Sequence, residues 1–215
     1  LFVDRLMNDR AEDEVVGLFR EEWRRALAKW MRRPQIVLLD EVHLVMTRAI
    51  CRWTGVPHEE ISAEEMAAIL ALMVENSGRI DPSVLLALMR RRKLERHLEG
   101  LVRSIRNGQV QLPPEAPIVQ LARFRDFKGD LLPEKTAAVE ILNILRPTLA
   151  IGRFIVFAAM ALQEQGDWRN KLLGADDAAY EFFAEEVRRL YPFFPLVGGI
   201  AVANFEWRGY PIETG

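Results

Sequence analysis

The sequence predicts a mainly α-helical protein with a small β hairpin near its C-terminus. Apolar residues recur three and four positions apart along most of the 215 residues, as they do on one face of a helix. Residues that favour helix starts and ends bound these runs. One run, 134–165, is far longer than a typical globular helix, and only 204–212 reads as a hairpin. We expect 1–215 to form a single, incomplete domain.

The first two helical runs have clear ends. The first carries apolar residues at helical spacing from Val15 to Trp30 and stops at Pro34, which cannot continue a helix. The second, 36–53, is followed by Gly55, the residue type that helix C-termini favour because it adopts the left-handed conformation without strain.

The next two runs begin with capping residues. Ser62 and Glu65 have the spacing of a capping box, in which each side chain satisfies a free backbone N–H at the start of a helix. Asp81 and Pro82 supply an N-cap and a first-turn proline for a further helix that closes at Asn107.

The second half contains the central helix. An irregular connection with a possible short helix at 117–124 leads into 134–165, and a shorter helix, 176–190, ends before Pro192. Pro147 lies inside the central run. A mid-helix proline costs about 3 kcal/mol and crowds the carbonyl four residues earlier, so we expect a kink there.

Arg146, next to this proline, is the strongest candidate for a site residue. Its neighbours from 141 to 151 are mostly apolar, and a desolvated guanidinium needs an anionic partner. A ligand carboxylate would suit it, and a structural ion pair would explain it equally well. A membrane span over 141–162 is disfavoured, because Arg146 and Arg153 would each cost about 2.5–3.5 kcal/mol near the bilayer centre.

Composition excludes several classes of function. The net charge of -2 offers no global attraction to nucleic acid, and we expect no nucleic-acid partner and no integral membrane span. The single cysteine, Cys51, cannot form an internal disulfide, which favours a cytoplasmic protein. The three histidines show no paired metal-ligand spacing, so no metal ligand is expected within this chain.

Three segments resemble known proteins. Residues 186–195, EVRRLYPFFP, are similar to the K-helix and following segment of cytochrome P-450 enzymes. Residues 141–152, ILNILRPTLAIG, and 47–57, TRAICRWTGVP, resemble the fatty-acid peroxygenase branch of that family. The segments follow the family's order. The resemblance implies a P-450-like helical fold from about the C-helix to the K-helix, as an interior fragment of a longer enzyme.

The resemblance also implies an activity. The parent enzyme is expected to use haem b and hydrogen peroxide to hydroxylate fatty acids at the α or β carbon, without an obligatory redox partner. Arg146 would hold the substrate carboxylate, which would itself act as general acid and base in place of the family's usual acid and threonine. Pro147 occupies that threonine neighbourhood and is the second catalytic candidate.

Other roles carry over residue by residue. Ala150 would face the haem, and Phe193 and Phe194 would line the acyl channel, although core packing explains these phenylalanines equally well from composition. Glu186 and Arg189 would form a structural ion pair, and such i,i+3 pairs are also common on ordinary helix surfaces. The resemblance places the axial cysteine in a glycine-rich loop absent from this sequence, so the fragment is expected to be inactive.

Alternatives remain open at this stage. A fatty-acid decarboxylase would share this architecture, and a reductase-dependent monooxygenase of the same family is a further possibility that Arg146 and Pro147 argue against. A helical, non-catalytic ligand-binding or interaction module would need no haem at all.

Overall fold

The structure is a computed structural model that describes residues 6, 8–58, 60–76, 82–194 and 198–215. The described chain is mainly α-helical with one two-stranded antiparallel sheet, as the sequence predicts. It divides into two compact units, Leu1–Val156 and Phe157–Gly215, which are described separately below. Whether they belong to one domain of a longer protein stays a prediction.

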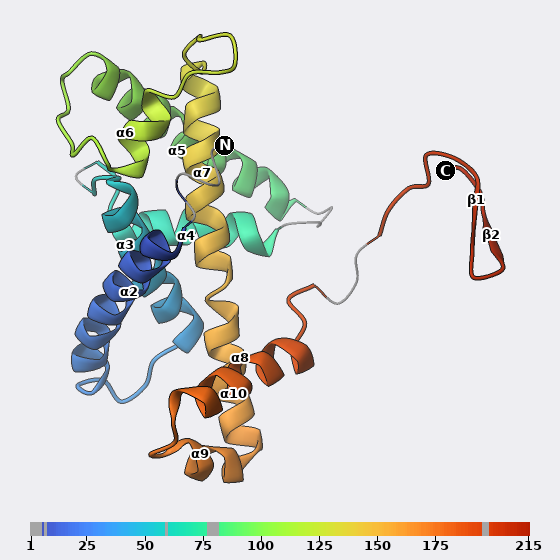
Figure 1. Ribbon diagram of the computed structural model, residues 1–215. Helices are drawn as coiled ribbons and strands as arrows, with labels where there is room; N and C mark the ends of the chain where they lie inside the picture. Colours follow the sequence, from blue (N-terminus) through green and yellow to red (C-terminus); the bar gives the residue numbers. More distant parts are fainter. Residues whose placement is uncertain (1–5, 7, 59, 77–81, 195–197) are drawn as a thin grey trace. The chain divides into compact units, whose positions relative to one another are not determined.

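The first unit is a helical bundle built around α7, which contacts the other core helices of the unit (Figure 1). Its helices are α2 (Asp9–Trp30), α3 (Leu38–Thr54), α4 (Ala63–Glu75), α5 (Ser83–Arg106), α6 (Pro117–Ala122) and α7 (Glu134–Ala150).

Local chemistry determines where these helices begin and end. The side chain of Ser62 accepts a hydrogen bond of 3.1 Å from the backbone N–H of Glu65, which confirms the N-cap predicted for α4. Gly55 ends α3 with φ 81°, and its N–H donates to the carbonyl of Cys51, as predicted. The predicted cap at Asp81 lies outside the described residues, and α5 begins after Pro82.

The core of the first unit lies on one face of α7. Ala138, Ile141, Leu145 and Leu149 recur three and four residues apart and are completely or almost completely buried. They belong to a single apolar cluster with residues of α3 to α6. Burial of this face fixes the rotation of α7, and so decides which of its remaining residues can take part in a site.

The predicted central helix is interrupted at 151–152. Helical structure continues through Pro147 to Ala150, turns at 151–152, and resumes in α8 (Arg153–Glu164). The N–H of Gly152 donates to the carbonyl of Leu149, a tighter bond than the α-helical pattern. The helical pattern therefore continues past Pro147 and is interrupted one turn later, at a glycine that packs closely against α3. The kink expected at Pro147 stays a prediction.

Gly152 explains the position of this interruption. A Cβ atom there would lie 2.8 Å from Cγ1 of Val42 and 3.0 Å from the carbonyl oxygen of Leu149. A larger residue would clash here, so only a glycine permits this close approach of the chain to α3.

The second unit contains α9 (Gly166–Leu172), α10 (Asp177–Leu190), and strands β1 (Phe205–Trp207) and β2 (Tyr210–Ile212), with most of α8. Asp176 caps α10 by accepting a 3.0 Å hydrogen bond from Ala179 N–H. The strands pair Phe205 with Ile212 and Trp207 with Tyr210 across a turn in which Arg208 has φ 50°. The short helix α9 was not predicted.

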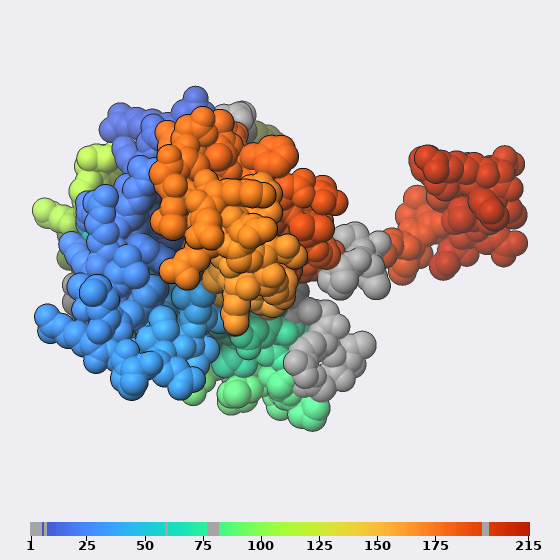
Figure 2. Space-filling model, turned by 90° about the horizontal axis from the view of Figure 1, so that it is seen from below, coloured from blue at the N-terminus to red at the C-terminus, as the bar shows by residue number. Residues whose placement is uncertain are grey.

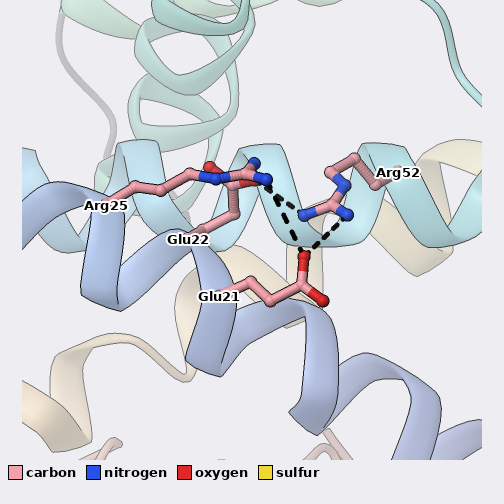
Figure 3. Close-up of polar contacts among 4 residues, drawn as sticks. All are labelled: Glu21, Glu22, Arg25 and Arg52. Carbon is pink, nitrogen blue, oxygen red and sulfur yellow. Dashed lines mark hydrogen bonds and ion pairs between the residues drawn. The ribbon is translucent and has the colours of Figure 1, made fainter.

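Helices α2 and α3 lie side by side (Figure 2) and are joined by a buried carboxylate (Figure 3). Glu22, whose side chain is 6% exposed, accepts hydrogen bonds at one oxygen from Arg25 at 2.6 Å and from Arg52 at 2.8 Å. Glu21 accepts a further bond of 2.9 Å from Arg52. The two acids and two arginines therefore tie the helices together.

By length and composition alone, one stretch among the described residues could cross a membrane, namely Glu134–Glu164. The core helix of a soluble protein passes the same test, so this is weak evidence, and the expected absence of a span stays a prediction.

Candidate functional site

Arg146 and Ala150 lie one turn apart on α7, beside its buried face. Both are partly exposed. Arg146 forms no hydrogen bond or ion pair with any residue that the structure describes, whereas most other arginines of the first unit's helices have a carboxylate or carbonyl partner. A cation held on a largely apolar helix without an internal partner remains available to an anion from outside.

Pro147 lines an apolar cavity of about 360 Å³ in the first unit. Three further residues of α7 and its C-cap residue, Ile151, form one wall, and residues of α2 and α3 form most of the rest. The remaining lining residues are Leu6, Ala11, Glu12, Val15, Val16, Ile50, Trp53, Asn143, Ile144, Thr148 and Ile151.

The walls of this cavity suit an alkyl chain. Val15 and Val16 on α2 and Trp53 on α3 present apolar surface, and the only charged lining residue is Glu12. Thr148 turns its hydroxyl inward to its own helix by donating 2.8 Å to the carbonyl of Ile144. The cavity can therefore bury apolar surface, which is favourable, without leaving this hydroxyl unpaired.

Glu186 and Arg189 form the pair that the sequence suggests. They lie one turn apart on α10, with 2.8 Å between a carboxylate oxygen of Glu186 and Nη2 of Arg189. This bond lowers the pKa of Glu186 and raises the pKa of Arg189. Both side chains keep substantial solvent contact, so the pair by itself contributes little to stability.

Phe193 and Phe194 follow α10 and contact each other edge to face, with ring centroids 4.7 Å apart. Phe194 is 62% exposed. Arg146, Pro147 and Ala150 thus share α7 in the first unit, whereas Glu186, Arg189 and the two phenylalanines belong to the second. A shared pocket for the two groups stays a prediction.

The residues of this chain could form part of the pocket around a haem, but they do not supply the ligand to its iron. Ala150, one turn from Arg146 on α7, is partly exposed, and its place beside a haem stays a prediction. Cys51, the only cysteine, is completely buried with its sulfur 3.3 Å from that of Met66, and burial raises its thiol pKa to about 12. A thiolate is the form that binds iron, so Cys51 is not the ligand.

Metal ligands are likewise missing from the described part of the chain, where no group of three or more His, Cys, Asp or Glu side chains could hold an ion. Of the histidines, His43 is buried on α3. Its Nε2 atom has no hydrogen-bond partner among the described residues.

Sequence reasoning missed the far walls of the cavity. Val16 and Trp53 look like ordinary members of helical apolar faces, yet Val16 is 42% exposed in the structure. The Glu22–Arg52 contact was also missed, since nothing in the local pattern pairs residues so far apart in sequence. The only sequence signal for these cavity walls is an apolar residue, such as Val16, that lies outside the apolar stripe facing the core.

Comparison with solved structures identifies three close relatives of the fold. Cytochrome P450SP alpha (CYP152B1) in complex with ibuprofen is 37% identical with a TM-score of 0.89, and this chain aligns over 100% of its own length and 52% of that chain. Cytochrome P450EX alpha (CYP152N1) with myristic acid is 30% identical, with a TM-score of 0.86 and coverages of 100% and 51%.

A cytochrome P-450 OleT variant in complex with arachidonic acid is 27% identical, with a TM-score of 0.89 and coverages of 100% and 52%. The chain therefore spans about half the length of the solved structures that it matches. No family model matches the sequence.

Proposed function

Because this chain belongs to the cytochrome P-450 family, in its CYP152 branch, we propose that its whole enzyme hydroxylates fatty acids at the α or β carbon with hydrogen peroxide. Arg146 would hold the substrate carboxylate. The observation that carries this proposal is Arg146, which has no partner among the described residues and is followed by Pro147, a residue that lines an apolar cavity.

The match between site and substrate rests on charge and polarity. A fatty acid has one carboxylate and a long apolar chain, and α7 carries one guanidinium, on Arg146, next to a residue that lines the apolar cavity. An arginine binds a carboxylate through two parallel hydrogen bonds, which fixes direction as well as position. Anchoring the head group would restrict oxidation to the carbons next to it.

Pro147, the neighbour of Arg146, supports the proposed use of hydrogen peroxide. Pro147 has neither a side-chain hydroxyl nor a backbone N–H, so it cannot relay protons. A carboxylate held by Arg146 would lie within hydrogen-bond reach of the reacting oxygens and could take and return the peroxide proton. The substrate would then complete the catalytic site, and no reductase would be needed.

Haem b, when bound by the whole enzyme, supplies the oxidising chemistry. Ala150 is proposed to face it with a small side chain, and Phe193 and Phe194 are proposed to border the acyl chain. Glu186 and Arg189 would have a structural role on α10. The fragment alone is proposed to be inactive, because its only cysteine is a buried thiol.

The test uses the full-length haem enzyme. Adding a long-chain fatty acid should shift the haem Soret band, and Arg146→Ala should abolish this shift and the peroxide-dependent hydroxylation. Lys135→Ala removes an exposed cation from the same helix and should change neither. A Soret shift that survives in Arg146→Ala would reject carboxylate anchoring.

Product analysis separates the alternatives. α- or β-hydroxy acids are the expected products, and terminal alkenes would indicate the decarboxylase instead. Turnover that requires a reductase and NAD(P)H would indicate the ordinary monooxygenase, and a full-length protein that binds fatty acid without haem would indicate the non-catalytic module.

A further inference from the structure

A second cavity of the first unit lies apart from α7. It has a volume of about 530 Å³ and is bordered by α5, by the segment between α3 and α4, and by the chain that follows α5. None of its lining residues belongs to α7 or to the second unit. Nothing in the function proposed above uses it.

His97 provides the first sign of a ligand. Its Nδ1 lies 3.0 Å from a carboxylate oxygen of Glu60, and both residues line the cavity. Its Nε2 is buried and has no hydrogen-bond partner among the described residues. A buried polar atom without a partner is unfavourable, so a ligand that bonds to Nε2 would remove that cost. The contact between Nδ1 and Glu60 restricts rotation of the ring.

Arg96, the next residue, adds a positive charge to the same cavity. Its Nε donates 3.3 Å to the carbonyl of Arg92, and its terminal nitrogens have no acceptor among the residues that the structure describes. When His97 is protonated, Nδ1 donates to Glu60 and Nε2 can donate to a ligand. Arg96 and His97 would then present donors to one anionic group.

Gly100 keeps the cavity open. It lies within α5, where glycine is less favourable than alanine, and a Cβ atom added to it would meet nothing within 4 Å. Packing therefore does not require glycine at this position. The missing side chain leaves free space on the same helix face as His97 and Leu101.

We infer that this cavity is a second ligand site, which takes a small organic monocarboxylate. The carboxylate would accept hydrogen bonds from Arg96 and from Nε2 of protonated His97. The apolar body would lie against Leu101, Val110 and Leu112, which line the cavity beside these polar groups.

The test is calorimetric titration of the full chain carrying Arg146→Gln, so that the head-group site proposed on α7 does not contribute. Hexanoate should bind saturably, and hexanamide, which lacks the charge, at least about tenfold more weakly. Arg96→Gln and His97→Gln should each weaken hexanoate binding by about tenfold or more. Equal binding of the two probes, or no saturable binding of hexanoate, would overturn the inference.

A matched pair of glycine variants tests the location. Gly100→Leu should abolish hexanoate binding by filling the cavity, whereas Gly17→Leu, at an equally open helical glycine on α2, should leave it unchanged. Unchanged binding in Gly100→Leu would reject this cavity as the site. Displacement of hexanoate by inorganic phosphate at equal concentration would reject the monocarboxylate assignment. Arg96 is exposed, so Arg96→Gln remains informative even where Gly100→Leu unfolds the chain.

Discussion

One carboxylate oxygen of Glu22 on α2 lies 2.8 Å from Nη1 of Arg52 on α3, and the same oxygen accepts a second hydrogen bond from Arg25 (Figure 3). Trp53, the neighbour of Arg52, lines the apolar cavity beside Pro147. The ion cluster therefore holds together the two helices that form the outer walls of the candidate site.

Glu22→Gln should lower the free energy of unfolding by about 1–3 kcal/mol, because a neutral amide replaces a buried acceptor of two charged donors. Glu14→Gln, which affects only an exposed pair with Arg10 on α2, should change it by less than about 0.5 kcal/mol. Urea denaturation measures both. Equal effects of the two variants would mean that burial of Glu22 gives it no special role.

Gly152→Ala should destabilise the chain by about 1–3 kcal/mol, since the added methyl group would overlap Val42 and the Leu149 carbonyl. Gly17→Ala, with open space around it in α2, should instead stabilise by about 0.5–1 kcal/mol through helix propensity. Opposite signs in thermal unfolding are the expected result. A neutral Gly152→Ala would show that the break in the central helix does not depend on this close contact.

Cys51 should not react with a thiol reagent such as DTNB at pH 8 in the folded chain. Burial raises its pKa from 9.0 to about 12, so the reactive thiolate is absent. The thiol should react at once in urea. The free energy of unfolding depends on pH for the same reason. Above pH 9 the unfolded chain loses the thiol proton before the folded chain does, so the free energy of unfolding falls as pH rises toward 12. Rapid reaction of the folded chain would contradict the burial.

His43 should make the chain sensitive to acid. Burial lowers the pKa of His43 below the ordinary 6.5. The negative charges of Glu75 and Asp40 raise this pKa and the positive charge of Arg153 lowers it, but the effect of burial is the largest. The unfolded chain therefore takes up the proton first, and the stability that His43 contributes above pH 6.5 is lost as pH falls through its folded pKa.

Urea denaturation between pH 7.5 and pH 5 measures this effect. His43→Gln, which cannot titrate, should show a smaller loss of stability across that range than the unaltered chain. An identical loss would place the acid sensitivity elsewhere.

Helix ends were predictable because their causes are local. Ser62 and Glu65 are three residues apart, and Asp176 and Gly55 act on backbone atoms of their own helices. The helical spacing of α7 likewise shows in its sequence. The interruption at 151–152 does not show in the sequence, since the close approach of Val42 to Gly152 is a long-range contact.

The sequence by itself determined the helices, their caps, and the position of Arg146 next to Pro147 on an apolar helix. Each of these features depends on residues within a few positions of one another. Only the tertiary structure decided that α2 and α3 would enclose a cavity beside Pro147, that Glu22 would join them, and that His97 would meet Glu60. Those contacts depend on how helix faces rotate and pack, and packing is settled by the whole core at once.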